Sequence, residues 1–96
     1  MSRRTKYTFR LYVAGDAPNS AQALGNLTAL CQTYLPDRYE IEVVDVLKAP
    51  MLALQANVLM TPTLLKLSPP PVRRIVGALS QMQIVLDTLG LEVIVK

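Results

Sequence analysis

Very few side chains in this sequence could carry out catalysis. The chain has a single cysteine, Cys31, and no histidine, so histidine-based catalysis and histidine-containing metal sites are excluded. Disulfide exchange requires two sulfurs, and Cys31 has no second cysteine to work with. The most informative chemical feature is the run Met60-Thr61-Pro62-Thr63, in which a proline stands just before a strand-like segment. This run predicts a turn with a cis peptide bond at Pro62.

The first half of the chain predicts a strand, a helix and a second strand. Residues 7–14 and 39–46 have the apolar alternation or apolar runs of strands. Between them, Asn19 and Gln22 have the spacing of a helix-capping pair, so we expect a helix to begin there and to end before Pro36. A helical crossover between two strands predicts parallel pairing with a right-handed connection. The expected buried stripe of this helix consists of Ala23, Leu24, Leu27, Leu30, Cys31 and Tyr34.

The second half predicts a short helix, two strands and a last helix. Pro50 suits the first turn of a helix, and residues 63–67 and 72–77 read as strands that the prolines of residues 69–71 could join into an antiparallel hairpin. Ser80 and Gln83 have the spacing of a capping box, and Gly90 suits the end of the helix that follows. Residues 91–95 form an apolar, β-branched tail. The order βαβαββα predicts an α/β fold with a mixed sheet, in one domain over residues 1–96.

This order of elements, together with the turn at Pro62, is that of a thioredoxin-like domain. In such domains a thiolate at the start of the first helix faces the cis-proline loop. Here the segment that would supply thiols reads Ala17-Pro18-Asn19-Ser20. A glutathione-binding role could still use the Ser20 hydroxyl and the backbone beside Pro62. The simpler interpretation is that Pro62 is structural and that Cys31 is a small buried hydrophobe, because nothing near it in sequence would lower the pKa of its thiol.

The carboxylates and glycines predict no catalytic or cofactor site. Glu40 and Glu42 fall on one face of a strand, where solvent exposure explains them best. Asp45 stands near the end of a parallel strand, where ligands often bind, but it has no second carboxylate or metal partner. The glycine pattern contains no phosphate-binding or dinucleotide-binding motif. We therefore expect a non-enzymatic protein without a cofactor or a metal.

Composition limits the kinds of partner. The net charge is only +3 and aromatic residues make up 5% of the chain, which gives little support to nucleic-acid binding. No apolar run approaches the ~20 residues of a membrane-spanning helix, and the start does not resemble a signal peptide. We expect a cytoplasmic protein that does not act at a membrane.

Arg73 and Arg74 follow the proline turn and begin the last predicted strand. Adjacent strand residues point to opposite faces, so a flat partner could meet only one of the two guanidinium groups. Two interpretations remain open, because arginine suits carboxylates at an interface and charge on an edge strand also prevents aggregation.

Five separated motifs lie between about Tyr7 and Leu89. The motifs are Leu11-Tyr12-Val13-Ala14-Gly15, Pro18-Asn19-Ser20, Val44-Asp45-Val46-Leu47-Lys48, Thr61-Pro62-Thr63-Leu64 and Pro70-Pro71-Val72-Arg73-Arg74-Ile75. In sequence, order and spacing they closely resemble the KaiB family of cyanobacterial circadian clock proteins.

The resemblance implies a protein-binding function. KaiB proteins bind the ring-shaped ATPase KaiC, help to sequester KaiA, and compete with the KaiB-like domain of a sensor histidine kinase for the same surface of KaiC. Under this hypothesis the candidate contacts are Lys48, Pro50, Arg73 and Arg74. A stress or signalling adaptor that has kept the fold and lost the clock partners is the alternative.

The family is also metamorphic, because its members exchange a tetrameric ground-state fold for a monomeric thioredoxin-like fold that binds KaiC. This sequence departs from the family where the two folds differ. Residues 51–57 lack the usual charges, and the acidic C-terminal tail is missing. These departures suggest a divergent paralogue in which one fold dominates. We expect the thioredoxin-like fold, because the capping box at Ser80 and the helix after it favour that packing.

Overall fold

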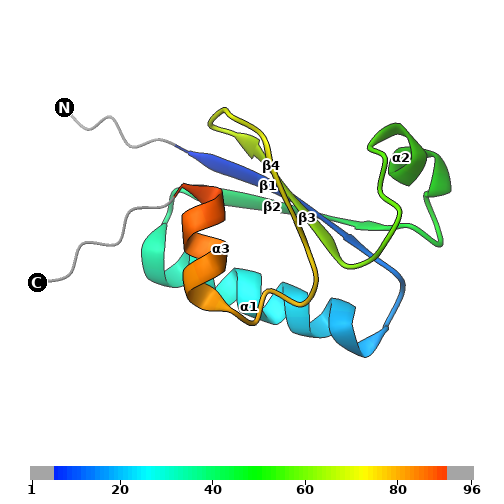
Figure 1. Ribbon diagram of the computed structural model, residues 1–96, viewed down its shortest axis with the longest axis horizontal. Coiled ribbons are helices and arrows are strands. Elements are labelled where there is room, and N and C mark those ends of the chain that lie inside the picture. The colour runs from blue at the N-terminus through cyan, green and yellow to red at the C-terminus, as the bar shows by residue number, and fades with distance from the viewer. Residues whose placement is uncertain (1–5, 91–96) are drawn as a thin grey trace, which may run out of the picture.

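The protein is described here by a computed structural model, which defines the backbone of residues 6–90 (Figure 1). The order of elements is the predicted one. The elements are β1 (Tyr7–Val13), α1 (Pro18–Tyr34), β2 (Tyr39–Asp45), α2 (Pro50–Gln55), β3 (Thr63–Ser68), β4 (Arg73–Val76) and α3 (Met82–Leu89). The predicted apolar tail at residues 91–95 lies outside the described residues.

The four strands form one mixed sheet in the order β2-β1-β3-β4. β1 pairs parallel with β2, as the helical crossover through α1 predicts, and Val13 lies opposite Asp45 at the end of this pair. β3 runs antiparallel to both β1 and β4. The sheet therefore has two edges within the described residues, β2 and β4, and the arginines Arg73 and Arg74 lie on the second of them.

The helices cover the two faces of the sheet unequally (Figure 1). α1 and α3 pack together on one face, over a core that includes the fully buried Phe9, Leu11, Leu27 and Leu89. Each such side chain contributes about 1.5–3 kcal/mol by leaving water. The short α2 lies alone on the other face, where it packs through Ala53 on a smaller cluster. This second cluster consists of Tyr12, Val44, Ala53, Val58 and Leu65.

Both predicted helix caps are wrong. α1 begins at Pro18 after Ala17, and no side chain caps it, so Asn19 lies inside the helix. Proline at the first position already sets the helical φ and has no amide hydrogen to satisfy, which removes part of the need for a cap. α3 begins at Met82 after Gln81, again without a side-chain cap, so Ser80 and Gln83 form no capping box.

The predicted start of α2 and the predicted end of α3 are confirmed. α2 begins at Pro50, and Gly90 ends α3 with a left-handed φ of 74°. The bond between Thr61 and Pro62 is cis, as predicted, and the bonds before Pro69 and Pro71 are cis as well. Over residues 6–90, no helix has both the length and the apolar character needed to cross a membrane.

Candidate protein-binding site

The cis-proline loop of a thioredoxin-type site is present at Pro62, where it forms a structural turn. Pro62 is buried and its carbonyl accepts a hydrogen bond from the Gly77 amide, at 2.9 Å, just beyond the end of β4. The hydroxyl of Thr63 donates to the carbonyl of Met60 and closes the turn on the other side. The Gly77–Pro62 bond joins the entry of β3 to the edge of the sheet.

The segment Ala17-Pro18-Asn19-Ser20, which stands where thioredoxins have their thiols, also has a structural role. Ser20 is only 2% exposed, and its Oγ accepts a hydrogen bond from the Ala14 amide at 3.2 Å. This bond holds the end of β1 against the first turn of α1. The hydroxyl that a glutathione site would use is therefore buried and already has a partner.

Cys31 is fully buried in the core between α1, α3 and the sheet. Burial in this apolar environment raises the pKa of its thiol from 9.0 to about 12, because the thiolate would lose its hydration. A thiol that stays protonated is a poor nucleophile. The structure thus agrees with the prediction of a small buried hydrophobe.

The acidic residues of β2 face solvent or hold a turn. Glu42 pairs with Arg10 at 2.8 Å, and Glu40 lies 3.8 Å from Lys6. The pKa of Arg10 is raised by its contacts with Tyr12 and Glu42. The carboxylate of Asp45 accepts hydrogen bonds from the Gly15 and Leu47 amides. Within residues 6–90, no cluster of histidine, cysteine, aspartate or glutamate could hold a metal ion.

Two like charges, Lys66 of β3 and Arg73 of β4, lie next to each other in the sheet. Lys66 is directly opposite Arg73 in the antiparallel pairing and is only 4% exposed. Burial, with a further contribution from Arg73, lowers the pKa of Lys66. Its ammonium lies 5.8 Å from the centre of the Tyr7 ring, which supplies some compensating attraction. No carboxylate among the described residues is paired with either cation.

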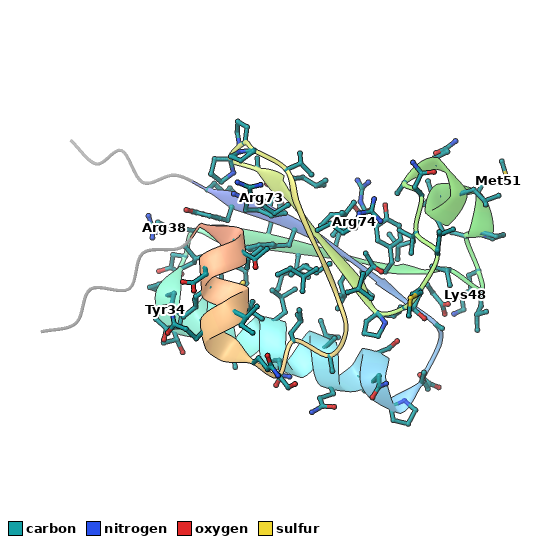
Figure 2. The ribbon with its side chains drawn as sticks, in the orientation of Figure 1. Tyr34, Arg38, Lys48, Met51, Arg73 and Arg74 are labelled. Carbon is teal, nitrogen blue, oxygen red and sulfur yellow. The ribbon has the colours of Figure 1, made fainter. Side chains whose placement is uncertain are left out.

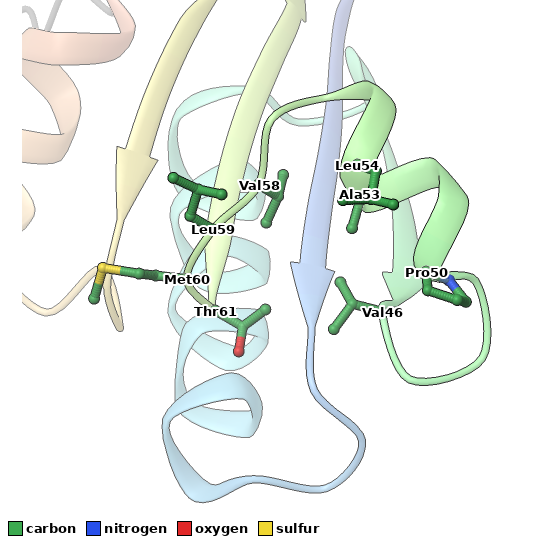
Figure 3. A pocket seen from close by; sticks show the side chains of 8 residues that line it. All are labelled: Val46, Pro50, Ala53, Leu54, Val58, Leu59, Met60 and Thr61. Atoms are coloured by element: carbon green, nitrogen blue, oxygen red, sulfur yellow. The ribbon is translucent and has the colours of Figure 1, made fainter.

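An open apolar groove of about 350 Å³ lies between α2 and the chain that leads into β3 (Figure 3). We call it the α2 groove. It is lined by Val46, Pro50, Ala53, Leu54, Val58, Leu59, Met60 and Thr61. Leu59 is 89% exposed, and Leu54 and Met60 are also mostly exposed. Large exposed apolar side chains gathered at one place mark interaction sites on soluble proteins.

The four predicted contact residues do not form one cluster (Figure 2). Pro50 lines the α2 groove, and Lys48 is exposed in the turn that precedes α2. Arg74 lies on the sheet face that carries α2, because it is opposite Leu65 of the second cluster. Arg73 points to the other face and lies near the end of α3 in Figure 2. The structure therefore brings Lys48 and Pro50 together and separates Arg73 from them.

Sequence reasoning missed the apolar part of this site. Leu54, Leu59 and Met60 are exposed and line the α2 groove, but the sequence pattern predicts none of them as a contact. A signal was available, because Leu59 and Met60 fall between a helix and a strand and fit the period of neither. The uncharged run over residues 51–57 was the second signal.

Solved structures with similar folds are thioredoxin-like. The N-terminal domain of Synechococcus elongatus SasA matches with a TM-score of 0.65 and 22% identity, covering 99% of this chain and 94% of that one. Mitochondrial thioredoxin 3 from Saccharomyces cerevisiae matches with a TM-score of 0.71 and 19% identity, covering 93% and 82% of the two chains. At this identity the likeness establishes the thioredoxin-like fold and nothing more.

Sequence comparison identifies the family. The KaiB domain model matches residues 10–91. A circadian clock oscillator protein KaiB of Prochlorococcus marinus is 50% identical over 91 residues, which cover 95% of this chain and 78% of the relative. The protein of the same name from Synechococcus sp. (strain RCC307) is also 50% identical, over 95% and 83% of the two chains. These names are those of a clock component and not of an enzyme. The chain belongs to the KaiB family.

Proposed function

We propose that this protein is a non-enzymatic, cytoplasmic binding module that docks on a KaiC-type ATPase through the α2 groove and modulates the ATPase's phosphorylation cycle. The proposal rests on the KaiB family membership and on one structural observation. That observation is the concentration of exposed apolar side chains, Leu54, Leu59 and Met60, around a groove that no other described part of the chain covers.

The groove has the make-up of an interface centre. Apolar and methionine side chains at the centre of an interface supply most of the binding free energy, and charged groups at the rim set orientation and association rate. Leu54 and Leu59 lie on the two walls, and the exposed Lys48 lies at the α2 end, where it can pair with a carboxylate of the partner. Pro50 fixes the start of the wall.

The same surface provides a mechanism for competition. The SasA N-terminal domain has the same overall fold as this chain. Two domains with one architecture can present similar surfaces to one partner, so a sensor histidine kinase of this kind would compete with this protein for the ATPase. Sequestration of a KaiA-type protein would follow once the complex has formed. We propose that the thioredoxin-like form is a monomer, and that a homotetramer belongs to the alternative fold.

Binding to purified KaiC, followed by size-exclusion chromatography, tests the proposal. Incubation should be long enough for slow refolding, and KaiC phosphorylation should be followed in parallel. Leu54→Glu places a charge on the groove wall and should weaken the complex at least about tenfold, or about 1.4 kcal/mol. Ile84→Glu is the matched control, because Ile84 is an exposed apolar residue on α3.

The outcomes separate the alternatives. A complex that Leu54→Glu weakens and Ile84→Glu leaves intact supports docking through the α2 groove. If Leu54→Glu and Ile84→Glu changed KaiC binding equally, the interface would lie outside the α2 groove. No complex with KaiC after long incubation would contradict the clock role, and binding to a different ATPase or kinase domain would then identify the protein as a signalling adaptor.

A further inference from the structure

α2 is too short to hold its own position. It has six residues, it has no side-chain cap, and its last turn contains no basic residue. Isolated helices of this length are not stable in water, so tertiary contacts must keep it in place. The chain then turns at Asn57, which has a positive φ of 57°, and continues directly into Val58 and Leu59 of the groove.

Arg74 supplies a contact at this turn. Its Nη2 donates to the carbonyl of Ala56 at 2.6 Å, and its Nη1 donates to the carbonyl of Asn57 at 3.1 Å. Carbonyl groups at the end of a helix have no partners within it and carry partial negative charge, so a guanidinium group is well suited to bind them. Arg74 thus joins the edge strand β4 to the end of α2, 17 to 18 residues earlier in the chain.

The two carbonyls stand at the junction of the groove walls. Ala53 and Leu54 precede them on one wall, and Val58 and Leu59 follow them on the other. Arg74 itself does not line the groove. A shift of this junction would move both walls, although no lining side chain had changed.

We infer that Arg74 is a positioning residue, which holds α2 and the following turn in place and so shapes the α2 groove without contacting the partner. The importance of the groove rests on the function proposed above, but the positioning role does not. The planar guanidinium presents two donors in a fixed fork, which a lysine ammonium cannot reproduce. Arg73 is a natural control, because it lies on the opposite face of β4 and makes no side-chain hydrogen bond to residues 6–90.

Amide hydrogen exchange on the free protein tests the positioning role. The reporter is the Val58 amide, which donates to the Ala53 carbonyl at 2.9 Å, supported by the Ala56 and Asn57 amides. Arg74→Met keeps the apolar stem and removes every donor, and it should speed exchange at these amides at least about tenfold, or about 1.4 kcal/mol. Arg74→Lys should have a smaller effect in the same direction, and Arg73→Lys should have none.

A global loss of stability must be distinguished from local loosening. The Val46 amide, which donates to Val13 at 2.8 Å, reports on the β1–β2 pair and should exchange at the wild-type rate in Arg74→Met. Unchanged exchange at Val58 in Arg74→Met would overturn the inference. So would loss of KaiC binding in Arg74→Lys without faster exchange, because that result would make Arg74 a direct contact. If the wild type does not bind KaiC, the proposed function fails and the exchange measurement alone decides the role of Arg74.

Discussion

The carboxylate of Asp45 and the amide of Gly15 are joined by a hydrogen bond of 3.1 Å, although the two residues are 30 positions apart. The same Oδ1 atom accepts the Leu47 amide at 2.9 Å. Gly15 has a positive φ of 55°, and a side chain added there would meet Leu47. Asp45 therefore holds together the turn that leads into α1 and the turn that leads to α2.

Asp45→Ala should lower the free energy of unfolding by about 1–2 kcal/mol, because two backbone amides lose a charged acceptor at a partly exposed site. Asp45→Asn keeps an acceptor oxygen and should cost less. Urea denaturation of the three proteins measures the difference. A loss in Asp45→Asn as large as that in Asp45→Ala would show that the charge, and not the acceptor, is what matters.

Ser20→Ala should lower the free energy of unfolding by about 1–2 kcal/mol, because the Ala14 amide would lose its partner at a buried site. It should not change behaviour on immobilised glutathione, to which we expect neither protein to bind. Thermal denaturation and a column assay check the two halves of the prediction. Retention of the wild type that Ser20→Ala abolishes would restore the glutathione hypothesis.

Cys31 should make the protein less stable at alkaline pH. The pKa of the thiol is raised from 9.0 to about 12 in the folded protein, so between these values the unfolded chain releases a proton that the folded protein keeps. The contribution of the buried thiol is complete below about pH 9 and is lost as pH rises toward 12. Urea denaturation of wild type and Cys31→Ala on both sides of about pH 9 should show a steeper alkaline decline for the wild type. Parallel curves would contradict the expectation.

Leu27→Ala and Leu24→Ala form a matched pair on α1. Leu27 is fully buried, whereas Leu24, predicted to share its stripe, is 36% exposed. Leu27→Ala should cost about 2–5 kcal/mol through lost burial and a cavity, and Leu24→Ala about 1 kcal/mol or less. Chemical denaturation of both variants gives the comparison. Equal costs would mean that Leu24 belongs to the core.

Lys66→Met should stabilise the protein by up to about 1 kcal/mol, because it removes a buried charge that lies directly opposite Arg73. The pKa of Lys66 is lowered in the folded protein, so folding disfavours the charged form. The gain should therefore be largest at neutral pH and should shrink as alkaline pH neutralises Lys66. Denaturation of both proteins at neutral and alkaline pH tests this. A loss of stability at neutral pH would mean that the contact of the ammonium with the Tyr7 ring outweighs the cost of burying the charge.

Sequence alone determined the order of the elements, and its single cysteine leaves no partner for disulfide exchange within the chain. Strand alternation and the prolines at positions 50 and 62 act within a few residues of the chain, so local pattern is enough to predict the elements that they form. The missing second cysteine is read directly from the sequence. The two predicted side-chain caps were wrong, because a prospective cap depends on the backbone angles of its own residue, which neighbouring prolines and packing change.

Only the tertiary structure shows the apolar groove on which the proposed binding function rests. Leu59 and Met60 fit the period of neither a helix nor a strand, which marks them as loop residues, but their place beside α2 depends on how that loop packs. The hydrogen bonds of Arg74 could not be predicted either, since its partners Ala56 and Asn57 are distant in the chain and are brought to it when β3 pairs with β4. A contact between separated segments depends on how the sheet and the helices pack, and that packing is a property of the whole chain.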